Sequence, residues 1–195
     1  MGRCPIMVPD IAFHDSWSIE SRLLRTAARA GVYPAVRLAA VPRVFAVAPL
    51  RAAPLVDRLA GTARPPRGMA RRRQTWDGFD GEWLQRSASS TAPRGRADGP
   101  TILYLHGGAF LIGGYRSHRR LVAAISAAAD AAPVLSVGYR QLPRWPIAQS
   151  VADGVTALRH LITADVDPRK IVVAGDSAGG GLAISVCVAA SAAGL

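Results

Sequence analysis

The sequence predicts an α/β fold in which helices flank a mostly parallel sheet. Half of its 195 residues are apolar, which is enough for one domain with a sizeable core. Short apolar runs alternate repeatedly with segments of helix length, the pattern that builds a sheet covered on both faces. Residues 171–174 include no polar side chain, as is typical of a strand buried on both sides.

The first third of the chain, residues 1–68, is predicted to be a helical segment followed by a linker. Residues 17–30 carry apolar side chains at helical spacing, and Gly31 follows as a stop signal. Pro54 opens a second expected helix, and the proline- and glycine-rich residues 61–68 form the expected linker. The apolar helical faces are typical of core or partner contacts.

Residues 69–195 are predicted to form the α/β domain. Strands are expected near residues 71–77, 82–86, 101–105, 134–139 and 171–175. Helices are expected near residues 117–130, 148–163 and 177–192, and residues 87–100 read as a polar loop.

The last expected strand runs into a G-x-S-x-G turn formed by Gly175, Ser177 and Gly179. A serine at a sharp strand-to-helix corner is pushed out of the sheet, and glycines two residues away on each side avoid collisions there. The helix that follows points unpaired N–H groups at the reacting centre, among them the amide of Ala178. The pattern predicts a nucleophilic serine at position 177.

A second motif follows the expected strand 101–105, which ends directly in His106-Gly107-Gly108-Ala109. Small residues in such a loop let backbone N–H groups approach a substrate carbonyl, so the loop is a predicted oxyanion loop. The predicted oxyanion donors are the amides of Gly107, Gly108, Ala109 and Ala178.

Taken in order, these motifs resemble those of the hormone-sensitive-lipase-like esterases of the α/β-hydrolase superfamily. That family has His-Gly-Gly-Gly in its oxyanion loop and Gly-Asp-Ser-Ala-Gly at its nucleophile elbow. Here Ala109 replaces the third glycine, and after Tyr139-Arg140 the chain has Arg144 where a glutamate is usual. The resemblance covers about residues 70–195.

The resemblance implies the N-terminal part of an α/β-hydrolase fold and a carboxylic-ester hydrolase that acts on small-molecule esters. It implies that residues 1–68 form part of a cap over the acyl pocket. It gives Ser177 the catalytic role and assigns supporting roles in the two motifs to His106, Gly175, Asp176 and Gly179.

The acid and the histidine base of such enzymes follow the serine in chain order, whereas all four histidines here precede it. His118 and His160 fall on expected helices and are interpreted as ordinary surface residues. The chain alone is therefore expected to be an impaired enzyme, apparently truncated at its C-terminus.

An alternative from another class is a non-catalytic remnant or interaction module. The nucleophile strand would then be an open sheet edge that pairs with a second copy or with a complementing chain. A third hypothesis starts from the net charge of +11 and the arginines between residues 64 and 73, which could attract an anionic membrane surface. Nucleic-acid binding is not expected, because the cluster lacks interleaved aromatic residues.

No cofactor or metal is expected, because the sequence has no metal-ligand spacing and its glycines do not follow the G-x-G-x-x-G pattern. The two cysteines, Cys4 and Cys187, lie far apart, and Cys187 is interpreted as a small core residue. Few cysteines and no apolar leader favour a cytoplasmic location.

Overall fold

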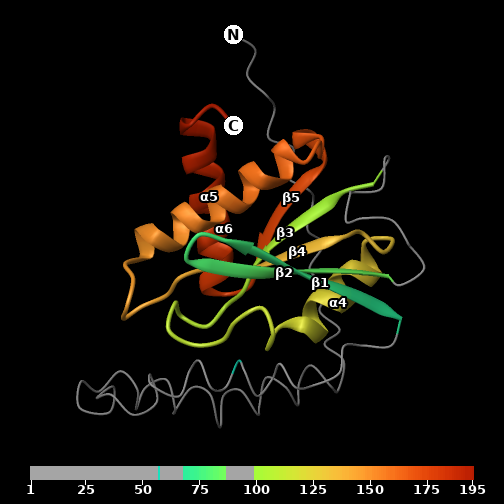
Figure 1. Cartoon of the computed structure of the whole chain (residues 1–195), viewed down its shortest axis with the longest axis horizontal. Coiled ribbons are helices and arrows are strands. Elements are labelled where there is room, and N and C mark those ends of the chain that lie inside the picture. The colour runs from blue at the N-terminus through green and yellow to red at the C-terminus, as the bar shows by residue number, and fades with distance from the viewer. Residues whose placement is uncertain (1–56, 58–67, 87–98) are drawn as a thin grey trace, which may run out of the picture. The chain divides into compact units, whose positions relative to one another are not determined.

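The computed structural model describes residue 57, residues 68–86 and residues 99–195 (Figure 1). The chain divides into two compact units, Met1–Val47 and Ala48–Leu195, and every described residue lies in the second. The predicted cap helices of residues 1–68 therefore lie outside the described residues, apart from Asp57 and Gly68.

The sheet has five described strands in the order β1-β2-β4-β3-β5. Their bounds are Met69–Trp76 for β1, Phe79–Arg86 for β2, Thr101–Leu105 for β3, Val134–Gly138 for β4 and Ile171–Gly175 for β5. β3 pairs in parallel with β4 and β5, whereas β2 pairs antiparallel with β1 and β4. The described sheet is thus mixed rather than mostly parallel. The reason for the β1–β2 pair is local: Asp77-Gly78 forms a two-residue turn with Gly78 at φ 81°, which folds β2 back along β1.

In the part of the chain that the structure describes, three α-helices cover the two faces of this sheet (Figure 1). α5 (Ile147–Thr163) and α6 (Ala178–Ala192) pack together on one face, and α4 (Arg119–Ala128) lies on the other. The predicted strands and helices of residues 69–195 are confirmed to within three residues at each end.

Alternation along the strands divides the core into two clusters. Leu103 and Leu105 of β3 face α5 and α6, while Ile102 and Tyr104 of the same strand face α4. Because both faces are covered, every residue of β3 is buried.

One buried ion pair fastens α4 to the sheet. Arg119 donates two hydrogen bonds to the Glu82 carboxylate of β2, at 2.6 and 2.8 Å, and both side chains are 8% exposed. Two parallel charge-assisted bonds fix the relative orientation of the two groups as well as their separation.

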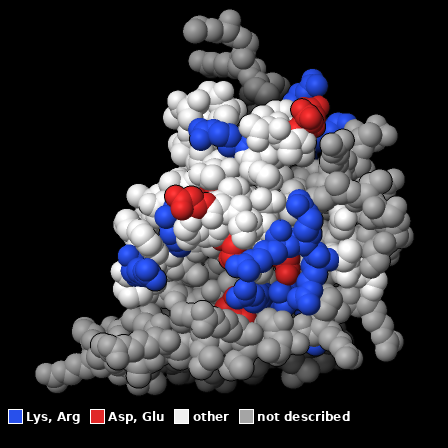
Figure 2. All heavy atoms as spheres, viewed as in Figure 1, with Lys and Arg blue, Asp and Glu red and all other residues white. Residues whose placement is uncertain are grey.

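The arginine cluster predicted from the sequence falls partly on β1, an edge strand on which Arg71, Arg72 and Arg73 are exposed. Arg73 pairs with Asp80 of β2 at 2.6 Å. Figure 2 shows basic side chains gathered on this face with acidic ones among them. Charged side chains on an edge strand protect it from pairing with other chains, which favours a solvated strand edge.

The opposite edge is apolar. β5 is the last strand in the described sheet, and Val172 is 47% exposed. On α6 the exposed fractions of Ile184 and Val188 are 69% and 65%. Cys187 of the same helix is also exposed, so its interpretation as a core residue is wrong: α6 is apolar all round, and only one of its faces meets the described sheet. Among the described residues no helix has the length and hydrophobicity needed to span a membrane.

Candidate active site

Ser177 stands at the corner between β5 and α6, in a backbone conformation that few residues adopt. Its φ is 51° and its ψ is −122°, and the residue is exposed. Such geometry costs about 1–3 kcal/mol and persists only where the surroundings enforce it. Here the surroundings are tight, since a Cβ at Gly179 would collide with the Leu105 carbonyl and one at Gly175 would collide with the Gly179 carbonyl. The strand, the corner and the helix thus have the arrangement predicted for a nucleophile elbow.

Asp176, the residue before the serine, ties the elbow to the loop that follows β3. Its Oδ1 accepts hydrogen bonds from the Tyr104 hydroxyl at 2.7 Å and from the Gly107 amide at 2.8 Å. Burial opposes ionisation of this carboxyl, but these hydrogen bonds and nearby His118 outweigh it, so the pKa of Asp176 is lowered. The two predicted motifs are therefore joined through one carboxylate.

The bond to Asp176 corrects one prediction about the oxyanion loop. The Gly107 amide points at the Asp176 carboxylate, so it is already engaged and is not a free donor for an oxyanion. The role of Gly107 is close approach, because a Cβ at this position would collide with that carboxylate. The remaining candidate donors are the amides of Gly108, Ala109 and Ala178.

These three amides have no described hydrogen-bond acceptor. Ala178 is the first residue of α6, and a first-turn amide has no partner inside its own helix. The loop between Gly108 and Ile112 is closed by hydrogen bonds from the amides of Leu111 and Ile112 to the Gly108 carbonyl, each 3.0 Å long. Within the described residues the arrangement leaves these N–H groups free to serve a ligand oxygen.

The loop also stores strain at Ala109. Its φ is 55°, and the following Phe110 has a φ of 60°, both in the left-handed region that glycine occupies at no cost. The sequence pattern showed only that alanine replaces a glycine here; the backbone angle gives the replacement an energetic cost.

His106 lies under the loop with none of its surface exposed. Its Nδ1 lies 2.8 Å from the Gly107 carbonyl, so Nδ1 carries the hydrogen, and its ring stacks on Tyr139 with centroids 4.4 Å apart. The Tyr139 hydroxyl in turn donates to the His106 carbonyl at 2.6 Å. Burial lowers the pKa of His106 to about 4, which keeps the ring neutral at physiological pH.

A second structural carboxylate holds the segment after β4. Asp153, which is 1% exposed, accepts hydrogen bonds from the Arg140 backbone amide at 2.8 Å and from its guanidinium at 2.6 Å. This contact fixes the start of the segment 140–145, which lies beside the oxyanion loop.

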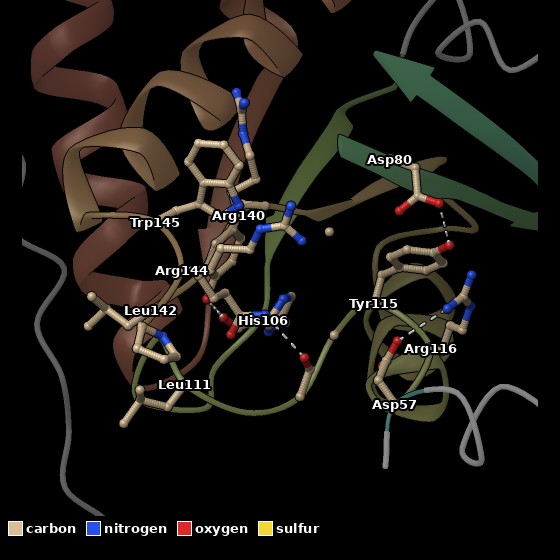
Figure 3. A pocket seen from close by; sticks show the side chains of 16 residues that line it. Asp57, Asp80, His106, Leu111, Tyr115, Arg116, Arg140, Leu142, Arg144 and Trp145 are labelled. Carbon is tan, nitrogen blue, oxygen red and sulfur yellow. Dashed lines mark hydrogen bonds and ion pairs between the residues drawn. The ribbon is translucent and has the colours of Figure 1, made fainter. Parts of the chain in front are cut away.

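A cavity of about 470 Å³ lies between the oxyanion loop and this segment (Figure 3). Its walls include His106 and Leu111 from the loop side and Arg140, Arg144 and Trp145 from the other side. Ser177 is not one of the lining residues, so the cavity adjoins the oxyanion loop rather than the serine itself. Sequence reasoning missed this cavity, because its walls come from four separate segments of the chain.

The described histidines are all engaged away from Ser177. His118, interpreted from the sequence as a surface residue, lies before α4 with Nδ1 2.9 Å from the Gly114 carbonyl and Nε2 3.7 Å from Asp176. His160, given the same interpretation, is half-buried with its ring edge-on to Trp76. Both interpretations are wrong, and in the part of the chain that the structure describes no side chain is hydrogen-bonded to the Ser177 hydroxyl. A search of the described residues for groups of metal-binding side chains finds none.

Comparison with known proteins agrees with this geometry. A family model for the alpha/beta hydrolase fold matches residues 102–195, which contain both motifs. Residues 102–195 are part of an α/β-hydrolase fold. The crystal structure of an esterase/lipase from an uncultured bacterium has a TM-score of 0.63 and 35% sequence identity, over 82% of this chain and 53% of that one. An esterase from the bacterial hormone-sensitive lipase family has a TM-score of 0.61 and 34% identity, over 73% of this chain and 45% of that one. The resemblance to hormone-sensitive-lipase-like esterases is therefore confirmed.

Curated relatives also match part of this chain. An acetyl-hydrolase of Streptomyces hygroscopicus is 47% identical over 90 residues, which are 46% of this chain and 30% of the relative. Esterase LipU of Mycobacterium tuberculosis is 48% identical over 92 residues, 46% of this chain and 31% of the relative. The matched region thus spans about a third of the length of these relatives.

Proposed function

We propose that this chain carries the nucleophile and the oxyanion donors of a carboxylic-ester hydrolase. The observation that supports the proposal most is the strained corner at Ser177, held against the oxyanion loop through Asp176. The names of two relatives, an esterase and an acetyl-hydrolase, support small-molecule esters as the proposed substrates.

In the proposed reaction the Ser177 hydroxyl attacks the ester carbonyl. The C–O bond to the alcohol breaks, the alcohol leaves with a proton that replaces the one lost by the serine, an acyl-enzyme forms, and water then releases the acid and restores the hydroxyl. Amides of Gly108, Ala109 and Ala178 donate to the oxyanion of each tetrahedral intermediate, and their positions are fixed before the reaction begins. Asp176 contributes by positioning, since it joins the loop to the elbow.

The base of this reaction is not supplied by a described residue. In serine hydrolases with a comparable triad, loss of the base costs about 10⁶ in turnover, while the oxyanion hole and substrate binding retain about 10³ to 10⁴ over water. We therefore propose that the chain by itself turns esters over slowly and that its activated serine is better detected by covalent trapping.

The test is reaction of the full chain with a fluorophosphonate ester at saturating concentration, followed by mass spectrometry of the peptides. We expect a slow phosphonylation of Ser177 that is absent in Ser177→Ala. Ser185, an exposed serine of α6, serves as the internal control because it lies at no such corner. A folded chain that stays unlabelled at Ser177, or is labelled equally at Ser185, would contradict the proposal.

A second candidate is an interaction module that pairs through the β5 edge. Its support is the row of exposed apolar side chains on β5 and α6, Val172, Ile184 and Val188. The partner would be a second copy or a complementing chain that continues the sheet. Sedimentation velocity distinguishes the cases: Val172→Lys should convert an assembled species into a monomer, and an unchanged sedimentation coefficient would exclude pairing through this edge.

A further inference from the structure

The cavity beside the oxyanion loop has three arginines in its walls, and they are not equivalent. Arg140 is held by the Asp153 carboxylate at 2.6 Å, and Arg116 lies 3.7 Å from Asp57. Arg144 is exposed, and within the described part of the chain no carboxylate lies within ion-pair distance of it. Asp57 and Asp153 thus compensate the charges of Arg116 and Arg140, and Asp80 is paired with Arg73, so Arg144 leaves the wall with one uncompensated positive charge.

Trp145 supports the free guanidinium. The Arg144 guanidinium carbon lies 5.7 Å from the centre of the Trp145 ring, and the Arg140 guanidinium lies 5.1 Å from the same ring. Both guanidinium groups therefore lie within cation–π distance of one indole. Arg144 is therefore presented at the cavity wall rather than left to range through solvent (Figure 3).

Two polar residues that line the cavity, His106 and Gln141, carry no charge. His106 is neutral with its hydrogen on Nδ1, so its buried Nε2 is a hydrogen-bond acceptor, and this atom has no partner among the described residues. The buried Oε1 of Gln141, another acceptor, is also without a described partner. Because neither residue supplies a positive charge, the favourable place for an anionic group is next to Arg144.

From this arrangement of charges we infer that Arg144 is a specificity-determining residue that selects esters carrying a free carboxylate. The inference rests on the proposed esterase function and deepens it. A single unpaired guanidinium offers a fork of N–H donors that matches the two oxygens of one carboxylate. A phosphate dianion would require a second free cation, and the other two arginines of the wall are already paired with carboxylates.

The test compares two ligands that differ only in that carboxylate, monoethyl succinate and diethyl succinate. Their dissociation constants are measured by calorimetry at low ionic strength with the full chain carrying Ser177→Ala, so that neither ester is consumed. We expect the monoester to bind about five- to tenfold more tightly than the diester. Added salt should weaken binding of the monoester and leave that of the diester unchanged.

Variants at position 144 test whether the preference for the monoester comes from Arg144. Arg144→Gln should remove the preference, and Arg144→Glu should reverse it. Arg159→Gln is the matched control: Arg159 is an exposed arginine of α5 that does not line the cavity, and its loss should leave the preference intact. Because Arg144 is exposed, none of these changes should affect folding.

The inference is overturned if the two esters bind equally, if the monoester does not bind, or if Arg144→Gln keeps the preference. These outcomes are distinguishable from failure of the esterase proposal. That proposal is tested by labelling of Ser177, whereas carboxylate recognition is measured in a chain that lacks this hydroxyl.

Discussion

At the scale of single residues, Asp176 is the group on which the site depends. One carboxylate oxygen holds both a strand tyrosine and the first glycine amide of the oxyanion loop. Removal of this oxygen leaves the loop without its connection to the elbow. An asparagine, whose amide oxygen is neutral and has the same position, would keep this connection.

We therefore predict that Asp176→Ala abolishes fluorophosphonate labelling of Ser177 and that Asp176→Asn retains most of it. Loss of the acceptor should also lower the free energy of unfolding by about 1–3 kcal/mol, because Tyr104 keeps a buried hydroxyl. Labelling rates and urea denaturation measure the two effects. Equal labelling of Asp176→Ala and the unmodified chain would show that the carboxylate does not position the loop.

Ala109 gives a prediction of the opposite sign. At a φ of 55° an alanine carries a steric cost that glycine does not. Ala109→Gly should raise the free energy of unfolding by about 0.5–1 kcal/mol, since the relief exceeds the extra entropy of the unfolded chain. Ala128→Gly, in the last turn of α4, is the control and should destabilise the fold. A loss of stability in Ala109→Gly would contradict the backbone conformation described here.

His106 makes stability depend on pH in a defined window. Its pKa is about 4 in the folded chain and 6.5 in the unfolded one, so between these values the unfolded state binds the additional proton. The contribution of neutral His106 to the free energy of unfolding is therefore complete above pH 6.5. As the pH drops to about 4, the free energy of unfolding falls by about 3 kcal/mol.

Denaturation midpoints between pH 7.5 and 4.5 measure this dependence, and His106→Asn should flatten it. The pKa of His160 is also lowered by burial, so His160→Gln is needed as a second variant and should remove a smaller share. If His106→Asn leaves the dependence of stability on pH unchanged, the buried neutral imidazole of His106 is not the origin of that dependence.

At the scale of elements, the attachment of α4 to the sheet depends on the buried pair Glu82–Arg119. Breaking such a pair from one side leaves an uncompensated buried charge, so Glu82→Ala should cost about 3–5 kcal/mol in the free energy of unfolding. Arg73→Ala breaks the exposed pair with Asp80 and should cost less than about 1 kcal/mol. Thermal and chemical denaturation measure the stability of the two variants. A similar loss of unfolding free energy in both would contradict the structural role of the buried pair.

The elements also show how far sequence reasoning reached. The hydrophobic runs located β3 and β5 to the residue, because a buried strand has a clear apolar pattern and both strands end in glycine-rich turns. The antiparallel side of the sheet was not anticipated, since the pairing of β2 with β4 is a long-range choice with no local signal. The same limit applied to the site. The motifs predicted Ser177 and the loop, but not the hydrogen bond from the Gly107 amide to Asp176, because it joins residues 69 positions apart.

At the scale of the whole molecule, the described domain has one charged edge and one apolar edge. Arg71 to Arg73 line β1, and exposed apolar side chains line β5 and α6. The candidate site opens between these edges, at the carboxyl ends of the parallel strands, where ligands of open α/β sheets bind. The proposed chemistry and the proposed carboxylate selection both depend on loops that this end of the sheet brings together.

The central claim is that Ser177 projects toward free amides of the oxyanion loop, and NMR of the phosphonylated chain tests it most directly. In the adduct the phosphoryl oxygen should shift the amide resonances of Gly108, Ala109 and Ala178, while the Gly107 amide, bound to Asp176, should stay in place. An adduct that shifts Gly107 alone, or leaves all three donors unmoved, would contradict the account.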